Sequence, residues 1–328
     1  MRTVIAIPPM PRMTGGIAVL YQVAERLREL GREVVITGNA DAPGMANEAA
    51  RGATILPWTT LSNELRPEDT FVIAEGWPNM AAPALAAKCR IFVYAQNWAY
   101  VFSALPHGVR WQNLPVSFIA VSDPVRRFLE KTHLPVAGEI RPAIDAARFA
   151  PRQPDAAKRL RIAYMPRKNK ALADQIRQIF TAMDDASSRV EWLEIHKMTS
   201  EEVAEVLGTS HIFLATGFPE GCPLPPLEAM ASGCLVVGFA GYGGWDYMRQ
   251  ATAGGYAPRF ALRETPFSPN GFFAADGDVM EGATLLAEAA ALARQGGEGY
   301  RALREAAFAT AAVYSAESQR AETARVFA

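Results

Sequence analysis

The stretch Thr216-Gly-Phe-Pro-Glu-Gly-Cys-Pro-Leu-Pro-Pro-Leu-Glu-Ala-Met-Ala-Ser-Gly233 decides the fold, because it joins an apolar strand, expected over 211–215, to a helix. Pro225 and Pro226 are suited to the first turn of that helix, where a backbone N–H would lack a partner, and Gly233 is suited to its end. The loop between them follows the carboxyl end of the strand. Open α/β sheets bind phosphorylated ligands at such ends, so we expect a binding site here.

Two carboxylates stand in this stretch, with seven residues between them. Glu220 lies in the loop and Glu228 lies inside the expected helix. Carboxylate oxygens are good hydrogen-bond acceptors for neighbouring hydroxyl groups. A single glutamate in a loop or on a helix is more often merely exposed to solvent.

The composition of the chain fits two ordinary globular domains. It has 328 residues, of which 50% are hydrophobic and 20% charged, and its net charge is −1. That charge argues against a general nucleic-acid-binding protein. The basic residues are unevenly distributed along the chain, however. A local excess of basic residues attracts phosphate or an anionic surface. The segment 148–170 contains one acidic residue, Asp155, and eight basic residues: Arg148, Arg152, Lys158, Arg159, Arg161, Arg167, Lys168 and Lys170.

The cysteines and the hydropathy pattern bear on the compartment. Cys89, Cys222 and Cys234 are widely spaced and form neither a disulfide framework nor a zinc-ligand pattern. The first residues read as a strand rather than a signal peptide, and the longest uncharged run, 91–109, contains polar residues and a proline. We therefore expect a cytoplasmic protein, with peripheral contact with a membrane left open.

Short apolar runs alternate with helical patterns along the chain, which favours parallel sheets covered by helices. We expect an N-terminal domain over 1–150, a second domain over 151–315 and a final helix over 316–328. The boundary is placed in the proline-rich segment 135–155, which has no clear period. The expected strands are 3–7, 34–37, 71–74, 91–95, 117–121, 161–165, 190–195, 211–215 and 235–239; the expected helices include 17–30, 122–131, one from 171, one opened by a capping box at Thr199 and Glu202, and an alanine-rich tail from 278.

Two further loops have residues suited to an anion. Gly15 and Gly16 precede the first helix, where glycine permits close approach of a ligand and the helix N-terminus favours negative charge. Alternatively, glycine is present in such a turn only because a side chain would not fit there. Arg167, Lys168 and Lys170 follow the first strand of the second domain and can neutralise a diphosphate, although a charge run is commonly a solvated loop.

The string Glu-Gly-x-x-Leu-Pro-Pro-Leu-Glu-Ala-Met-Ala-Ser-Gly, 220–233, resembles the Glu-x7-Glu signature of retaining, nucleotide-sugar-dependent glycosyltransferases of family 4. The resemblance covers most of the second domain and the first domain only in outline. It implies the GT-B fold, in which two Rossmann-like domains face a cleft. The second domain would bind a nucleoside diphosphate sugar and the first would present a hydroxyl acceptor, such as a glycan or a lipid-linked sugar. No metal or other cofactor is implied.

The resemblance also implies roles for individual residues of the second domain. Glu228 would bind the ribose hydroxyls and Glu220 the hydroxyls of the transferred sugar. Arg167 would stabilise the departing diphosphate together with a lysine, for which Lys168 and Lys170 compete and Lys168 is preferred. In the family a glycine pair lies beside the diphosphate, and Gly15 and Gly16 match it. Cys222 and Pro223 replace a more usual Phe-Gly, so amide contacts would come from Cys222 and Leu224, because Pro223 has no N–H. Gly241 to Gly244 match a glycine-rich family loop that either lines the donor site or makes a tight turn.

The first domain departs further from the family. Gln96 and Asn97 stand where many members have a histidine, and neither can act as an acid or base. Glu75 is the best ionisable candidate on the acceptor side, with an exposed loop carboxylate as the alternative. Four aromatic residues are suited either to an acceptor platform or to the core: Trp77, Trp98, Tyr100 and Trp111.

Two other functions stay open, and the departures at Gln96 and Pro223 motivate the first of them. One is a catalytically silent GT-B protein that binds a nucleotide or glycan. The other is a GT-B enzyme of another class, such as a sugar-nucleotide epimerase.

Overall fold

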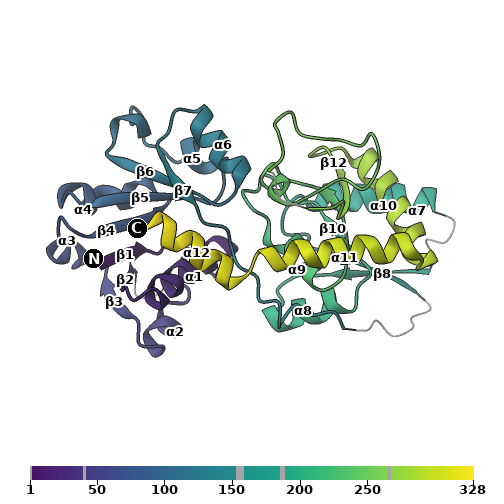
Figure 1. Cartoon of the computed structure of the whole chain (residues 1–328), viewed down its shortest axis with the longest axis horizontal. Helices are drawn as coiled ribbons and strands as arrows, with labels where there is room; N and C mark the ends of the chain where they lie inside the picture. Colours follow the sequence, from purple (N-terminus) through teal and green to yellow (C-terminus); the bar gives the residue numbers. More distant parts are fainter. Residues whose placement is uncertain (1, 40–41, 153–158, 185–188, 264–266) are drawn as a thin grey trace. The chain divides into compact units, whose positions relative to one another are not determined.

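The computed structural model describes residues 2–39, 42–152, 159–184, 189–263 and 267–328. Contacts divide the chain into two units, of which unit 1 comprises Met1–Ala143 with Ala316–Ala328 and unit 2 comprises Ile144–Ser315 (Figure 1). The division falls after residue 143 rather than 150. The reason is that Ile144 and Phe149 pack into a core of unit 2, and the Ile144 N–H donates to the Tyr314 carbonyl at 2.9 Å. Asp155 and Lys158 of the basic segment lie outside the described residues.

Unit 1 is built on a seven-stranded sheet in the order β3-β2-β1-β4-β5-β6-β7, and every neighbouring pair is parallel. The chain runs outward from β1 to β3 and then returns to place β4 beside β1. The loops after β1 and β4 therefore diverge, which is the usual place for a ligand in an open α/β sheet. The strands are β1 Arg2–Ala6, β2 Glu33–Gly38, β3 Thr54–Pro57, β4 Thr70–Ala74, β5 Arg90–Ala95, β6 Val116–Ala120 and β7 Val136–Glu139.

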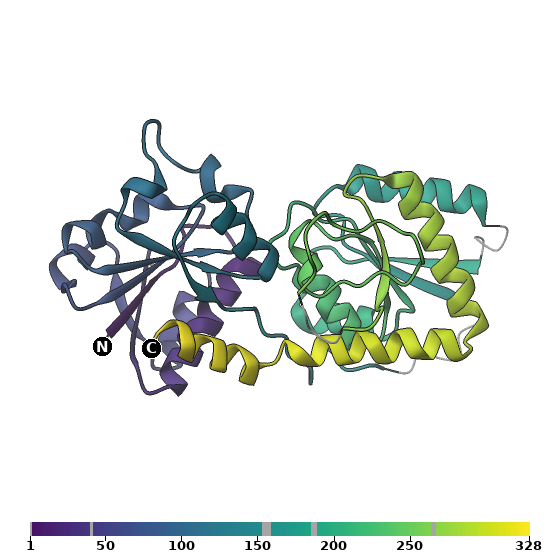
Figure 2. The same cartoon turned by 45° about the horizontal axis from the view of Figure 1, so that its top comes forward.

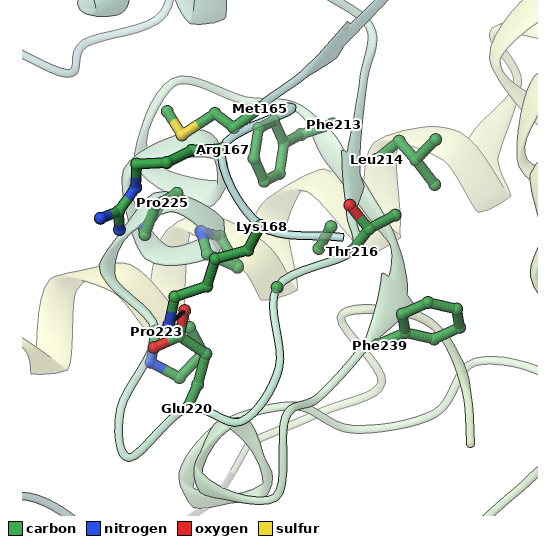
Figure 3. A pocket seen from close by; sticks show the side chains of 13 residues that line it. Met165, Arg167, Lys168, Phe213, Leu214, Thr216, Glu220, Pro223, Pro225 and Phe239 are labelled. Atoms are coloured by element: carbon green, nitrogen blue, oxygen red, sulfur yellow. Dashed lines mark hydrogen bonds and ion pairs between the residues drawn. The ribbon is translucent and has the colours of Figure 1, made fainter. Parts of the chain in front are cut away.

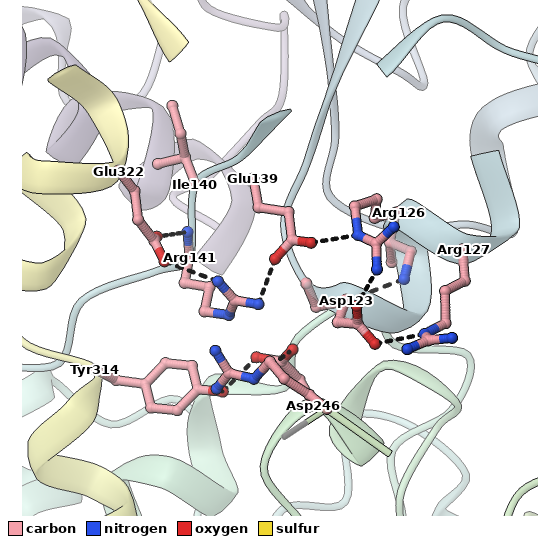
Figure 4. Close-up of polar contacts among 12 residues, drawn as sticks. Asp123, Arg126, Arg127, Glu139, Ile140, Arg141, Asp246, Tyr314 and Glu322 are labelled. Atoms are coloured by element: carbon pink, nitrogen blue, oxygen red, sulfur yellow. Dashed lines mark hydrogen bonds and ion pairs between the residues drawn. The ribbon is translucent and has the colours of Figure 1, made fainter. Parts of the chain in front are cut away.

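The longest helix of unit 1, α1 (Gly15–Glu29), packs beside α12 (Ala316–Val326), although 286 residues separate them (Figure 2). An ion pair holds α12 in place: the Glu322 carboxylate accepts from the Arg141 guanidinium and from its backbone N–H, both at 2.7 Å (Figure 4). Both side chains are 11% exposed. The other helices are α2 Met45–Ala50, α3 Leu61–Glu64, α4 Ala82–Ala86, α5 Tyr100–Ser103 and α6 Asp123–Lys131.

Unit 2 contains a five-stranded parallel sheet in the order β12-β11-β10-β8-β9. The order reverses between β8 and β10, so a second crevice opens at their carboxyl ends. One apolar core lies between the sheet and helices α7 and α10, and another lies on the opposite face under α8, α9 and α11. The elements are β8 Leu160–Tyr164, α7 Lys170–Met183, β9 Val190–Glu194, α8 Ser200–Gly208, β10 Ile212–Ala215, α9 Leu224–Ala231, β11 Leu235–Phe239, β12 Gly271–Ala274, α10 Val279–Gln295 and α11 Glu298–Val313.

The expected α/β class with two parallel-sheet domains is confirmed, and the expected strands appear within one residue at each end. The capping box of Thr199 and Glu202 is present. Three strands were missed: β3, β7 and β12, each of four residues at the edge of its sheet. The alanine-rich tail contains three helices. None of the helices that the structure describes is both long and apolar enough to cross a membrane.

Candidate functional site

A pocket of about 460 Å³, counted with its open mouth, lies at the carboxyl ends of β8 and β10. It therefore occupies the point where the strand order of unit 2 reverses. Its charged lining comprises Arg167, Lys168 and Glu220, and the Lys168 side chain extends to Glu220 (Figure 3). The remaining wall is mostly apolar and comprises Met165, Phe213, Leu214, Ala215, Thr216, Gly217, Pro223, Pro225, Pro226 and Phe239.

The two basic residues in this pocket differ in their partners. The Lys168 ammonium lies 2.7 Å from a carboxylate oxygen of Glu220 and also donates to the Pro219 carbonyl at 3.2 Å. Arg167 is exposed and forms no ion pair with any residue that the structure describes. Lys170 instead lies 3.4 Å from Asp174 along α7 and does not line the pocket.

The backbone of Glu220 is held between two parts of the glycine-rich segment after β11. The Glu220 N–H donates to the Gly241 carbonyl at 2.9 Å, and the Gly243 N–H donates to the Glu220 carbonyl at 3.0 Å. A Cβ on Gly243 would lie 2.0 Å from the Gly221 carbonyl oxygen. Glycine is therefore required because two backbones pass in direct contact. This segment supports the Glu220 loop, a role that the sequence analysis did not anticipate.

Asn169 is a further residue that the sequence analysis missed. It precedes α7 with φ 56° and ψ 41°, a left-handed conformation that asparagine tolerates better than most residues. Its side-chain amide donates to the Thr216 carbonyl at 2.9 Å and to the Phe218 carbonyl at 3.2 Å. Asn169 thus ties the loop after β8 to the loop after β10. An asparagine just before a helix was the available signal.

The N-terminus of α9 has fewer amide donors than most helices. Its N-cap is Pro223, and Pro225 and Pro226 occupy the first turn, so three N–H groups are missing. The Pro223 carbonyl accepts from the Tyr247 hydroxyl at 2.7 Å. Leu224 supplies the N–H that remains at this end. Attraction for an anion in the pocket must therefore come mainly from Arg167 and Lys168.

Glu228 lies on α9. Unlike Glu220, which precedes this helix, Glu228 does not line the pocket. Its side chain is half-buried, and its carboxylate accepts no hydrogen bond from the part of the chain that the structure describes. Burial raises the pKa of Glu228 from 4.5 to about 7, opposed by the charge of Arg148. Burying a carboxylate without a hydrogen-bond donor costs free energy, and hydroxyl groups of a ligand would reduce that cost.

In unit 1 the loops after β1, β4 and β5 meet. Glu75 is 4% exposed, and its carboxylate accepts from the Gln96 N–H at 3.1 Å and from the Asn97 N–H at 2.8 Å. Burial raises the pKa of Glu75 to about 7. A Cβ on Gly16 would lie 2.3 Å from the side-chain oxygen of Gln96. Glu75 is thus not an exposed loop carboxylate, and Gln96 lies directly over Gly15-Gly16 at the start of α1.

The aromatic candidates of unit 1 have different surroundings. Trp111 is 1% exposed and donates to the Val101 carbonyl at 2.6 Å, so it belongs to the core. Trp98 packs against Phe128 with ring centroids 6.0 Å apart. Tyr100 is 48% exposed, which leaves it accessible to a ligand. Among the residues that the structure describes, no group of three or more His, Cys, Asp or Glu side chains is arranged to hold a metal ion.

Other proteins are similar to this chain in sequence or in structure. No family model matches it. It is 28% identical over 239 residues to an alpha-1,6-glucosyltransferase of Actinobacillus pleuropneumoniae serotype 7 (strain AP76), and the match covers 70% of each chain.

The whole chain superposes on solved structures. HepE of Anabaena, crystallised with UDP and glucose, has a TM-score of 0.70 at 11% identity, with 99% of this chain and 98% of that one covered. The lipopolysaccharide outer core galactosyltransferase WaaB has a TM-score of 0.67 at 12% identity, with 100% and 99% covered. Sucrose-phosphate synthase of Thermosynechococcus elongatus has a TM-score of 0.63 at 13% identity, with 99% and 98% covered. At these identities the similarity establishes the fold, which is GT-B as expected.

Proposed function

We propose that this GT-B protein is a retaining glycosyltransferase of family 4. It moves a hexose from a nucleoside diphosphate sugar to a hydroxyl acceptor in the synthesis of a glycan, polysaccharide or glycolipid. The observation that supports the proposal most strongly is the pocket at the carboxyl ends of β8 and β10, which is lined by Arg167, Lys168 and Glu220. The glucosyltransferase to which the chain is 28% identical and the UDP complex of HepE support a nucleotide sugar as the donor.

The second unit supplies the donor contacts in this proposal. Arg167 and Lys168 neutralise the diphosphate, which leaves with more charge than it carries in the donor. Glu220 accepts hydrogen bonds from the transferred sugar, and Glu228 accepts them from the ribose. Cys222 and Leu224 contribute backbone N–H groups. In the first unit, Gly15 and Gly16 accommodate the diphosphate.

The reaction breaks the bond between the anomeric carbon and the β-phosphate oxygen and forms a bond from that carbon to the acceptor oxygen on the same face. The departing phosphate takes the proton of the acceptor hydroxyl, so no basic side chain is required. This is consistent with a Glu220 carboxylate that is already paired with Lys168. No metal ion is needed, because Arg167 and Lys168 supply the positive charge.

The acceptor side belongs to the first unit. Glu75 fixes the backbone of the Gln96–Asn97 turn through its two hydrogen bonds, and the side chains of that turn bind the acceptor. The acceptor is a glycan or a lipid-linked sugar. A lipid-linked acceptor would place this cytoplasmic enzyme in peripheral contact with the membrane.

A thermal-shift screen with UDP-, GDP-, ADP- and dTDP-sugars identifies the donor, because a bound ligand stabilises the folded state. We expect one nucleotide class to raise the melting temperature, with UDP-glucose as the first candidate. Candidate acceptors are then added, and release of the nucleoside diphosphate is measured. Binding without acceptor-dependent release would indicate a silent binding protein. Conversion of the sugar without an acceptor would indicate an epimerase.

A further inference from the structure

The ion pair between Lys168 and Glu220 places two functional groups of the proposed donor site in contact with each other. Their side chains are 28% and 22% exposed, and both line the pocket. In Figure 3 the Lys168 side chain extends toward Glu220, whereas Arg167 lies apart from the pair. A phosphate that binds Lys168 must therefore compete with a carboxylate that is already present.

We propose that Glu220 acts as an internal competitor for Lys168, so that the site discriminates the intact nucleoside diphosphate sugar from the nucleoside diphosphate product. This inference rests on the proposed function and adds selection between donor and product to it.

The argument follows from charge. When the intact donor binds, sugar hydroxyls can donate to the Glu220 carboxylate, and Lys168 is released to the phosphates. The sugar also separates the carboxylate from the terminal phosphate. After transfer the sugar is gone, and once the proton taken from the acceptor has passed to solvent the terminal phosphate carries one more negative charge than in the donor. Glu220 then repels that phosphate and competes for Lys168, which favours release of the product.

The two side chains differ in how far they can move. The Glu220 backbone is fixed on both sides by Gly241 and Gly243, so the point from which its carboxylate extends is held beside the pocket. Lys168 carries its charge on a flexible four-carbon stem and can turn from the carboxylate to a phosphate. Lys168 is therefore the partner that moves farther when the pair separates.

The test is calorimetric titration at low salt with inorganic pyrophosphate, which does not depend on the base, with the nucleoside diphosphates UDP, GDP, ADP and dTDP, and with the corresponding nucleotide sugars. The proteins are the wild type, Glu220→Gln, Lys168→Met and the double variant. Glu191→Gln is the matched control, because Glu191 forms a similar half-exposed ion pair with Arg161, at 2.9 Å, outside the pocket. Glu220→Ala serves as a second charge-removing variant, since the backbone bonds of Glu220 do not need its side chain.

Glu220→Gln should bind pyrophosphate and the nucleoside diphosphate about fivefold more tightly, the factor that an ion pair of about 1 kcal/mol predicts. The gain should shrink at high salt, be smaller in the Lys168→Met background, where only the direct repulsion by Glu220 is relieved, and be absent in Glu191→Gln. The same variant should lose the preference for the intact nucleotide sugar. Unchanged or weaker binding of pyrophosphate by both Glu220 variants would overturn the inference and leave the donor site intact. A wild type that binds neither pyrophosphate nor any of the four nucleoside diphosphates would instead overturn the proposed function.

Discussion

Single side chains at the pocket of unit 2 show which charges are available to a ligand. Lys168 is engaged by Glu220 and Lys170 by Asp174, whereas Arg167 has no acidic partner among the described residues. An unpaired guanidinium at the mouth of a pocket contributes little to folding. It can form two hydrogen bonds to a phosphate without first breaking an ion pair.

Arg167→Ala should therefore reduce turnover with the identified donor about a hundredfold, the usual effect of removing one donor to a developing anion. The melting temperature should change little, because the side chain is exposed. Steady-state kinetics and a thermal melt on the same preparation check this. Wild-type turnover would remove Arg167 from the site.

Glu228 gives a pH-dependent prediction. Its folded pKa, about 7, is higher than the ordinary value of 4.5, so the folded state holds the proton more tightly than the unfolded state. The stabilisation from this protonation is complete below pH 4.5 and is lost as the pH rises through 7. Glu228→Gln should thus melt higher than the wild type at pH 8 and equally at pH 4.

The same variant should bind the nucleoside diphosphate more weakly, since in the proposed function the ribose hydroxyls lose an ionised acceptor. Melting curves at the two pH values and a titration at pH 8 test both parts. Unchanged affinity would contradict the ribose role. A lower melting temperature at pH 8 would mean that the carboxylate stabilises the fold.

At the scale of elements, the Glu220 loop is positioned by two neighbours far away in sequence. Asn169 holds its beginning through two carbonyls, and the segment after β11 holds Glu220 itself. The glycines of that segment permit a backbone contact too close for any side chain. Positioning by backbone contacts explains how a loop can present a carboxylate at a fixed place.

Gly243→Ala should displace this loop and destabilise unit 2 by about 2 kcal/mol, as overpacking commonly does. Transfer should fall far more than binding of the nucleoside diphosphate, because the displaced Glu220 is the group that we propose to contact the sugar. Gly297→Ala is the control, since a Cβ there has nothing within 4 Å. Equal loss of binding and transfer would show that Gly243 does not act through Glu220.

The sequence predicted the buried elements better than the exposed ones. Strands such as β4 and β5 are apolar on both faces, and their composition alone identifies them. The edge strands β3 and β7 are only partly buried, so their residues carry no such pattern. Arg167, Lys168 and Glu220 were predicted because they follow strands. Asn169 and the support by Gly243 depend on contacts between distant loops, which local patterns do not encode.

At the scale of the whole molecule, unit 1 is assembled from two separate parts of the chain. The helix α12 packs on α1, and the Arg141–Glu322 pair links it to the segment after β7. Gln319 strengthens this attachment, because its side-chain amide donates to the Arg141 carbonyl at 2.9 Å. The last helix is therefore a structural part of the N-terminal unit.

Glu322→Ala should destabilise unit 1 by about 3 kcal/mol, because the buried Arg141 guanidinium loses one of its carboxylate partners and the Arg141 N–H loses its acceptor, while the pair with Glu139 stays. Hydrogen exchange should accelerate in α12 and β7 and remain unchanged in α10 of unit 2. Glu317→Ala, on the first turn of the same helix, is the control. Uniform acceleration in both units would show that they do not unfold independently.

The division of unit 1 has a consequence for biosynthesis. The residues of unit 2 form one continuous segment, Ile144–Ser315, so this unit can fold as soon as that segment has emerged from the ribosome. The N-terminal sheet, although made first, waits with the surface of α1 uncovered until α12 has been translated. A prematurely terminated polypeptide would therefore lack Phe327 on Phe92 of β5 and leave one face of α1 open, and chaperones and proteases would act on it before it could bind a donor.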